Sequence, residues 1–91
     1  MLNELELRVL LAVDATRADR WKIMDELRRG GLPKSEIDRA ARLLDPLRTR
    51  HRFVERLDSD TYQLTDRGRA AARDAVSRLD QLVGYASRTL R

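Results

Sequence analysis

The stretch YQLTDRGR at residues 62–69 joins an expected strand to the start of a long helix. Tyr62 and Leu64 alternate with polar neighbours, a period of two that is typical of a strand with one buried face. Thr65 is suited to cap a helix, because its hydroxyl can accept a hydrogen bond from an amide of the following turn. Asp66 suits the positive end of that helix. The sequence therefore predicts a strand that ends at Leu64 and a helix that begins at Asp66 and runs to the end of the chain.

A second strand and a tight turn are expected just upstream. Residues 53–57 have the composition of a partner strand, and Asp58-Ser59-Asp60 supplies the turn between the two strands. Gly68, in the first turn of the helix, permits the close approach of another segment. The predicted unit is a small β-hairpin that leads directly into a helix.

Two amphipathic helices are expected in the first third of the chain. Asn3 can cap the first, which a polar link at residues 14–18 follows. Asp19 can cap the second, which Gly30-Gly31 stops. We interpret Trp21 as a core anchor in preference to a base-stacking side chain. The other apolar positions assigned to the core are Leu2, Leu5, Val9 and Ala12 or Val13 in the first helix, and Ile23, Met24 and Leu27 in the second.

A third helix follows the glycine turn, and its two faces differ. Ser35 with Asp38 three residues later approximates a capping box, so the helix is expected to begin there. Arg39 and Arg42 lie one turn apart on the face away from the apolar positions. Pro46 is expected to end the helix at the preceding residue or to kink it. The apolar positions recur at helical spacing and are expected to face the core: Ile37, Ala40, Ala41, Leu44 and Leu47.

The order of these elements carries a resemblance to a known family. Two helices joined by a short turn form a helix-turn-helix arrangement, and a hairpin and a long helix follow it here. This order, with the junction Y-x-L-T-x-x-G-R at residues 62–69, resembles the winged helix-turn-helix regulators of the MarR and PadR families over roughly residues 5–80. The resemblance implies a mainly α fold with a small β-hairpin, the wing, and double-stranded DNA as the partner. The chain departs from the family pattern in having no glycine between the third helix and the wing, and in having an acidic wing tip.

The excess of positive charge lies on the third helix with the start of the wing, and on the last helix, where residues 65–91 are basic by three. The formal net charge is +4, and residues 34–52 carry six basic and three acidic side chains. A basic face of this kind is the electrostatic footprint of a polyanion, and an ordinary solvated surface is the alternative. Arginine on the outer face of such a helix can pair bidentately with guanine, whereas phosphate contacts position the protein. We therefore expect base reading by Ser35, Arg39 and Arg42, and backbone contacts by Lys34, Arg48, Arg50, Arg52 and Arg56.

The last helix, expected over residues 66–91, carries an apolar seam. The apolar positions are spaced alternately by four and three residues, as in a coiled coil, and Ala75 and Leu82 widen the seam into a stripe. A helix of this length is longer than so small a domain needs for its own core. We expect a second chain to cover its distal half in a homodimer, the commonest closed assembly, whereas packing onto the first helix is the alternative. The expected dimer interface consists of Val76, Leu79, Val83, Ala86 and Leu90.

Composition excludes several classes of function. The 91 residues are expected to form one domain, 1–91, and they include no cysteine and one histidine, His51. Disulfides and thiolate metal sites are therefore excluded, and no metal, cofactor or enzyme activity is expected. Gly30-Gly31 lacks the strand and lysine of a phosphate-binding loop. The longest apolar run, Val9 to Val13, is too short to span a membrane, so a cytoplasmic, nucleoid-associated protein without an evident small-molecule effector is expected.

These patterns favour a dimeric regulator of transcription that binds double-stranded DNA sequence-specifically and represses by occupancy. The alternative from another class is a winged-helix protein-interaction module within a larger nucleoprotein complex. The third helix would then present Glu36, Arg39 and Arg42 to a partner protein. RNA binding is a third alternative, for which the few aromatic residues provide no evident stacking platform.

Overall fold

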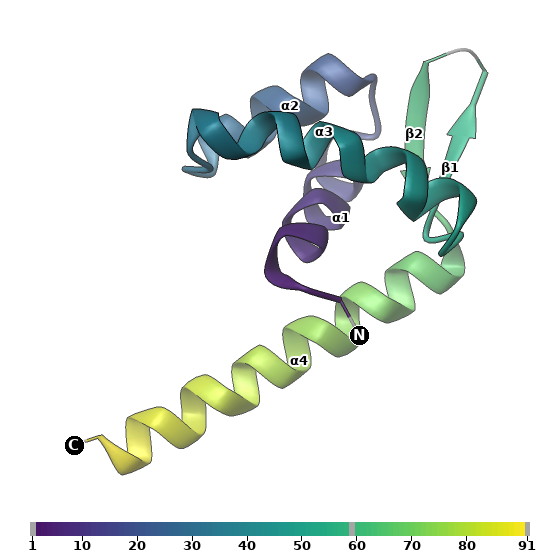
Figure 1. The fold of residues 1–91 in the computed structure, drawn as a ribbon. Helices are drawn as coiled ribbons and strands as arrows, with labels where there is room; N and C mark the ends of the chain where they lie inside the picture. The colour runs from purple at the N-terminus through teal and green to yellow at the C-terminus, as the bar shows by residue number, and fades with distance from the viewer. Residues whose placement is uncertain (1, 59, 91) are drawn as a thin grey trace.

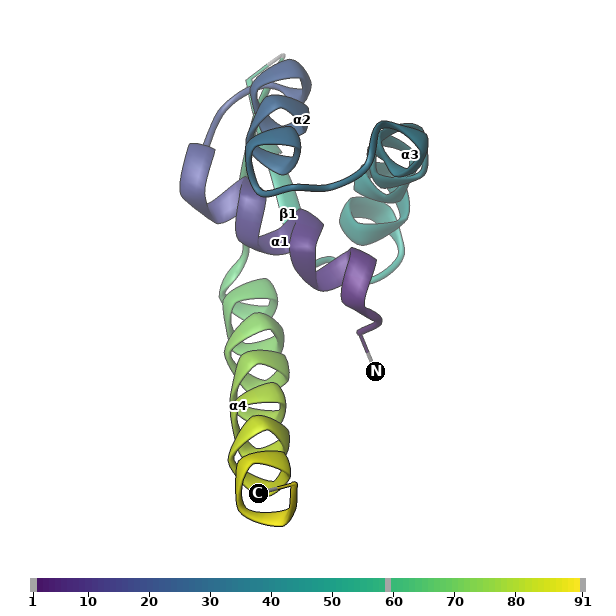
Figure 2. The same ribbon diagram turned by 90° about the vertical axis from the view of Figure 1, so that its left-hand side faces the viewer.

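The computed structural model describes residues 2–58 and 60–90. Within these ranges the chain forms four helices and one two-stranded antiparallel sheet. The elements in chain order are α1 (Glu4–Thr16), α2 (Arg20–Arg29), α3 (Lys34–Thr49), β1 (Val54–Leu57), β2 (Thr61–Leu64) and α4 (Asp66–Thr89). Figures 1 and 2 show α1, α2, α3 and the hairpin gathered in one body, from which α4 extends as a long rod. The predicted class, mainly helical with a small hairpin, is confirmed at this level.

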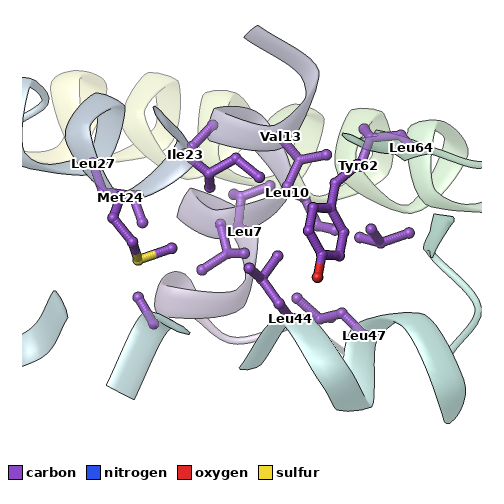
Figure 3. Close-up of a cluster of buried hydrophobic side chains, with 14 of the residues drawn as sticks. Leu7, Leu10, Val13, Ile23, Met24, Leu27, Leu44, Leu47, Tyr62 and Leu64 are labelled. Carbon is purple, nitrogen blue, oxygen red and sulfur yellow. The ribbon is translucent and has the colours of Figure 1, made fainter. Parts of the chain in front are cut away.

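The hydrophobic core lies among α1, α2, α3 and the hairpin. Leu10 and Val13 of α1 lie between side chains contributed by α2, α3 and β2 (Figure 3). Each such side chain contributes about 1.5–3 kcal/mol by leaving water. Among the described residues no polar or charged side chain is buried in this core. The largest fully buried side chains are Leu10, Ile23, Leu44, Leu47, Val9, Val13 and Val54.

Side-chain caps begin three of the helices where the sequence predicts them. Asn3 Oδ1 accepts from the Glu6 N–H (2.8 Å), and the Glu6 carboxylate accepts from the Asn3 N–H (2.9 Å), which completes a capping box. Asp19 accepts from the N–H of Lys22 (2.9 Å) at the start of α2. Thr65 caps α4. These bonds satisfy amides that have no partner inside the helix.

The hairpin is stabilised by pairing between its two strands and by contacts with the helices. Val54 lies opposite Leu64 in the antiparallel pair. Tyr62 and Leu64 are buried, as the alternation predicts, and Val54 of the partner strand is buried too. The Tyr62 N–H donates to the carbonyl of Ala18 (2.9 Å), which fastens β2 to the link between α1 and α2. Ser59, in the predicted turn, lies outside the described residues.

The junction of β2 and α4 packs as closely as Gly68 suggested. The Thr65 hydroxyl accepts from the Gly68 N–H (3.0 Å) and donates to the Arg52 carbonyl (2.7 Å). The Thr65 N–H donates to the Phe53 carbonyl (3.0 Å). A Cβ placed on Gly68 would lie 2.0 Å from that Phe53 oxygen, so only glycine fits here.

The predicted start of α3 was wrong, and so was an end at the residue before Pro46, whereas a kink at Pro46 stays a prediction. The helix begins at Lys34 after Pro33, so Ser35 lies inside the first turn and makes no capping bond. It continues through Pro46 to Thr49. Proline removes one backbone bond, but the fully buried Leu44 and Leu47 on either side of it share the core face. Their packing offsets the missing bond.

Two predictions in the N-terminal region were also wrong. Helix α1 continues to Thr16, whose hydroxyl donates to the Ala12 carbonyl (2.9 Å), so the polar link is shorter than residues 14–18. Trp21 is 76% exposed and does not anchor the core. It precedes Ile23 by two residues, a rotation of about 200° around a helix, so it points away when Ile23 is buried.

Candidate nucleic-acid interface

The outer face of α3 presents basic side chains opposite its buried face. Ile37 and Leu44 are buried, whereas Ser35, Arg39 and Arg42 are exposed. The exposed positions recur at intervals of four and three residues, so they form one stripe along the helix. The three side chains predicted to read bases therefore share one surface, and Lys34 is exposed at the N-terminal end of the same helix.

Arg39 and Arg42 are available to an external anion. Within residues 2–58 and 60–90, no ion pair engages either guanidinium. Arg39 borders a surface depression, between α3 and the N-terminal end of α1, that Glu36 and Glu4 also line. Asp38 is exposed on the outer face too. The stripe is therefore basic with acidic neighbours, which limits its attraction for phosphates in general.

Two of the predicted backbone contacts are already engaged by carboxylates. Arg48 lies 3.8 Å from Asp45, which is also 3.7 Å from Arg20 of α2. Arg56 lies 3.9 Å from Asp60 across the hairpin. Arg56 and both carboxylates are exposed and Arg48 is half-buried at the surface, so the pairs are weak and a phosphate could replace the carboxylate. The link between α2 and the end of α3 through Asp45 could not be foreseen from sequence spacing.

Arg50 and Arg52 occupy the segment between α3 and β1, at the base of the hairpin. Both side chains are exposed, and in the described part of the chain neither forms an ion pair. Arg52 has a φ of 57°, a left-handed conformation that favours glycine. Arg52 therefore has a backbone conformation that glycine adopts more readily. Hydrogen bonds from Thr65 to Arg52 and from Phe53 to the Leu47 carbonyl (2.8 Å) fix this segment.

A second surface, the apolar stripe of α4, extends beyond the body. The body buries Gly68 and Ala72 near the start of α4, but Leu79, Val83 and Leu90 are 50%, 62% and 80% exposed. Coverage of the distal half by a second chain stays a prediction. Of the residues predicted for the dimer interface, four are exposed, namely Val76, Leu79, Val83 and Leu90, and Ala86 is half-buried.

A groove of about 610 Å³ separates α4 from the N-terminal end of α1. Leu2 and Leu7 line the groove, and so do Phe53 and His51, whose rings are stacked at a centroid distance of 5.5 Å. Sequence patterns did not predict this groove, because it depends on the angle at which α4 leaves the body. The α4 wall consists of Ala71, Asp74, Ala75, Arg78, Leu79 and Leu82.

Metal sites and membrane spans are two further features that bear on function. No group of three or more His, Cys, Asp and Glu residues could hold a metal ion within residues 2–58 and 60–90. None of the helices described has both the length and the apolar character needed to cross a membrane.

A comparison of the chain with protein-family models, curated proteins and solved structures found no match. The function of the chain is therefore inferred from its two exposed surfaces, the basic stripe of α3 and the apolar stripe of α4.

Proposed function

We propose that this chain is a winged helix-turn-helix protein that binds double-stranded DNA as a homodimer and regulates transcription. In this proposal α2 and α3 are the helix-turn-helix, the hairpin is the wing, and α3 is the recognition helix. The observation that supports it best is the stripe of Ser35, Arg39 and Arg42 opposite the buried face of α3. A helix that is packed on one face and carries unpaired arginines on the other can enter a major groove without disturbing the core.

Each group of basic residues has a separate part in the proposed complex. Arg39 and Arg42 would pair with guanine edges, because a guanidinium matches the two acceptors of that base. Arg50 and Arg52 would bind phosphates at the base of the wing and fix the register of the protein on the duplex. The hairpin tip carries Asp58 and Asp60, so tip contacts with phosphate are not part of the proposal. Repression by occupancy of the site is the simplest mode of regulation.

A protein-interaction module is the second candidate, and two observations favour it. Asp38 is exposed on the proposed recognition face, where it would repel phosphate. Trp21 is exposed at the start of α2 beside the hairpin, in a depression that Arg56 and Tyr62 also line. Exposed tryptophan and arginine are the residue types that dominate protein interfaces.

Selection of bound duplexes from a random DNA pool tests the proposal against this second candidate. The expected result is enrichment of a two-fold symmetric sequence, with an affinity that falls as salt rises. Absence of both enrichment and duplex binding would reject the DNA-binding proposal and leave the interaction module.

Replacing Arg39 or Arg42 with alanine is expected to weaken binding to the selected duplex by about 1–3 kcal/mol and to relax preference at one base pair. Folding is expected to be unaffected, because both side chains are exposed. Titrations against the selected duplex and its single-base variants measure both effects. Asp38→Ala, on the same face of α3, is the matched control and is expected not to lower affinity. Unchanged affinity and base preference in both arginine variants would remove α3 from base reading.

Replacing Arg50 or Arg52 with glutamine is expected to weaken binding to every duplex alike. The salt slope is expected to fall by about one unit for each phosphate that the protein no longer binds. Affinities at several salt concentrations provide the slope. Arg88→Gln, which removes the same charge near the end of α4, should leave the slope unchanged. Weaker binding to the selected sequence alone, with a constant slope, would contradict the assignment to phosphate.

A further inference from the structure

The α4 wall of the groove has an ordered composition along its length. Small side chains lie at its N-terminal end, at Ala71 and Ala75, and leucines lie at its C-terminal end, at Leu79 and Leu82. The acidic Asp74 and the basic Arg78 lie between these ends. One turn of helix separates the two charged residues, and their side chains form an ion pair at 2.9 Å.

Two copies of this wall are complementary in side-chain size and charge when the two α4 helices run antiparallel. In an antiparallel pair of α4 helices, Ala71 lies opposite the partner's Leu82, and Ala75 opposite the partner's Leu79. The same register places Asp74 opposite the partner's Arg78. An axis between Val76 and Ser77 places Ala71 directly opposite the partner's Leu82. It brings the other two pairs, Ala75 with Leu79 and Asp74 with Arg78, to within one residue of direct opposition. Each leucine then fills the space beside an alanine, and each charge meets its opposite.

A parallel pair lacks this complementarity. It would place Asp74 against the partner's Asp74 and Arg78 against the partner's Arg78, so that like charges would repel along the seam. It would also leave space between facing alanines while crowding facing leucines. Both charge and side-chain volume therefore favour the antiparallel direction.

We infer that the groove between α1 and α4 receives α4 of a second copy of this chain, in the antiparallel direction. Leu79 and Leu82 are 50% and 60% exposed in a single copy, so they are free to enter the partner's groove. The register carries the partner's Ala86 alongside the first turn of α4, and the partner's Leu90 lies beyond that start. This inference rests on the homodimer of the proposed function and adds its direction and register. It also moves the interface: Leu79 lines the groove, whereas Val76 and Val83 of the predicted interface do not.

Charge reversal at Asp74 and Arg78 tests the direction of the pair in the intact chain. Asp74→Arg alone is expected to raise the dimer dissociation constant about tenfold or more, because like charges then face each other at two symmetric places. The double variant D74R/R78D is expected to return the constant close to that of the unmodified chain. Sedimentation equilibrium provides the constants, and circular dichroism confirms that the helices are formed.

The matched control is Asp25→Arg in α2. Asp25 forms an intrahelical ion pair with Arg28 (2.8 Å), so this variant also loses a local pair, but away from the groove. It is expected to leave the dissociation constant unchanged. A similar weakening in D25R and D74R, or a double variant no tighter than D74R, would overturn the inferred register.

Spin labels at single cysteines provide an independent readout, because the chain has no cysteine of its own. Ser77→Cys and Ser87→Cys place labels near the two-fold axis and far from it. In the antiparallel pair the Ser87 labels are expected to be about 30 Å further apart along the helix axis than the Ser77 labels, at 1.5 Å per residue. Equal distances at the two sites would establish a parallel dimer and overturn the inference while leaving the dimer itself intact. A chain that stays monomeric would overturn both the dimer and its direction, and DNA selection would remain a separate test of DNA binding.

Discussion

Gly68→Ala is expected to destabilise the fold by about 3 kcal/mol or more, because the new methyl group collides with backbone rather than with a movable side chain. A Cβ at this position would lie 2.0 Å from the carbonyl oxygen of Phe53 and 2.8 Å from its carbonyl carbon. That carbonyl cannot move away at low cost, since it accepts the Thr65 N–H at 3.0 Å. Relief of the collision would require α4 to separate from the hairpin. Urea denaturation followed by circular dichroism measures the change in stability.

Gly84→Ala is the matched control for this prediction, and it is expected to raise the stability of the fold instead of lowering it. Gly84 lies in the same helix, and a Cβ there would meet nothing within 4 Å. Alanine is expected to stabilise this helical position by about 0.5–1 kcal/mol, because glycine loses more backbone freedom on folding. Equal stability of the Gly68 and Gly84 variants would contradict the packed junction between α4 and Phe53.

Short-range chemistry accounts for the parts of the fold that the sequence predicted. The caps at Asn3, Asp19 and Thr65 depend on a side chain and an amide three residues away, so the local sequence determines them. The strand Thr61–Leu64 follows from alternation against one buried face. The stripe of Arg39 and Arg42 follows in the same way, because helical spacing places them opposite Leu44.

Tertiary packing determined the features that the sequence did not predict. Pro46 indicates a helix end by its residue type, but burial of the leucines on both sides of it favours continuation. Trp21 has the residue type of a core anchor, although the rotation set by Ile23 turns it outward. The pairing of Asp45 with Arg20 joins residues of different helices and has no local signal. The groove, likewise, exists only once α4 leaves the body at its observed angle.

Leu82→Asp is expected to convert the proposed dimer into a folded monomer. Leu82 is 60% exposed in the single chain, so its replacement removes little from the monomer's own core. Burial of a leucine contributes about 2 kcal/mol. Each dimer buries two copies of Leu82, one from each chain, so the dimer dissociation constant is expected to rise by about a thousandfold. The carboxylate would weaken the dimer further, because removing a charged group from water has a free-energy cost of its own. Light scattering gives the mass, and circular dichroism reports folding.

The same variant also tests whether dimerisation serves DNA binding. A two-fold dimer engages two half-sites about 34–36 Å apart, or a multiple of that spacing, and linking the two binding events raises affinity by about a hundredfold or more. Leu82→Asp is therefore expected to lose that factor on the selected duplex while retaining the affinity of one recognition helix for a half-site. Gly84→Asp adds the same charge about 200° further around α4, so it is expected to stay dimeric and to bind with nearly the original affinity. If the Leu82 variant became monomeric without losing affinity for the full site, each chain would bind DNA independently, and the apolar stripe of α4 would serve assembly alone.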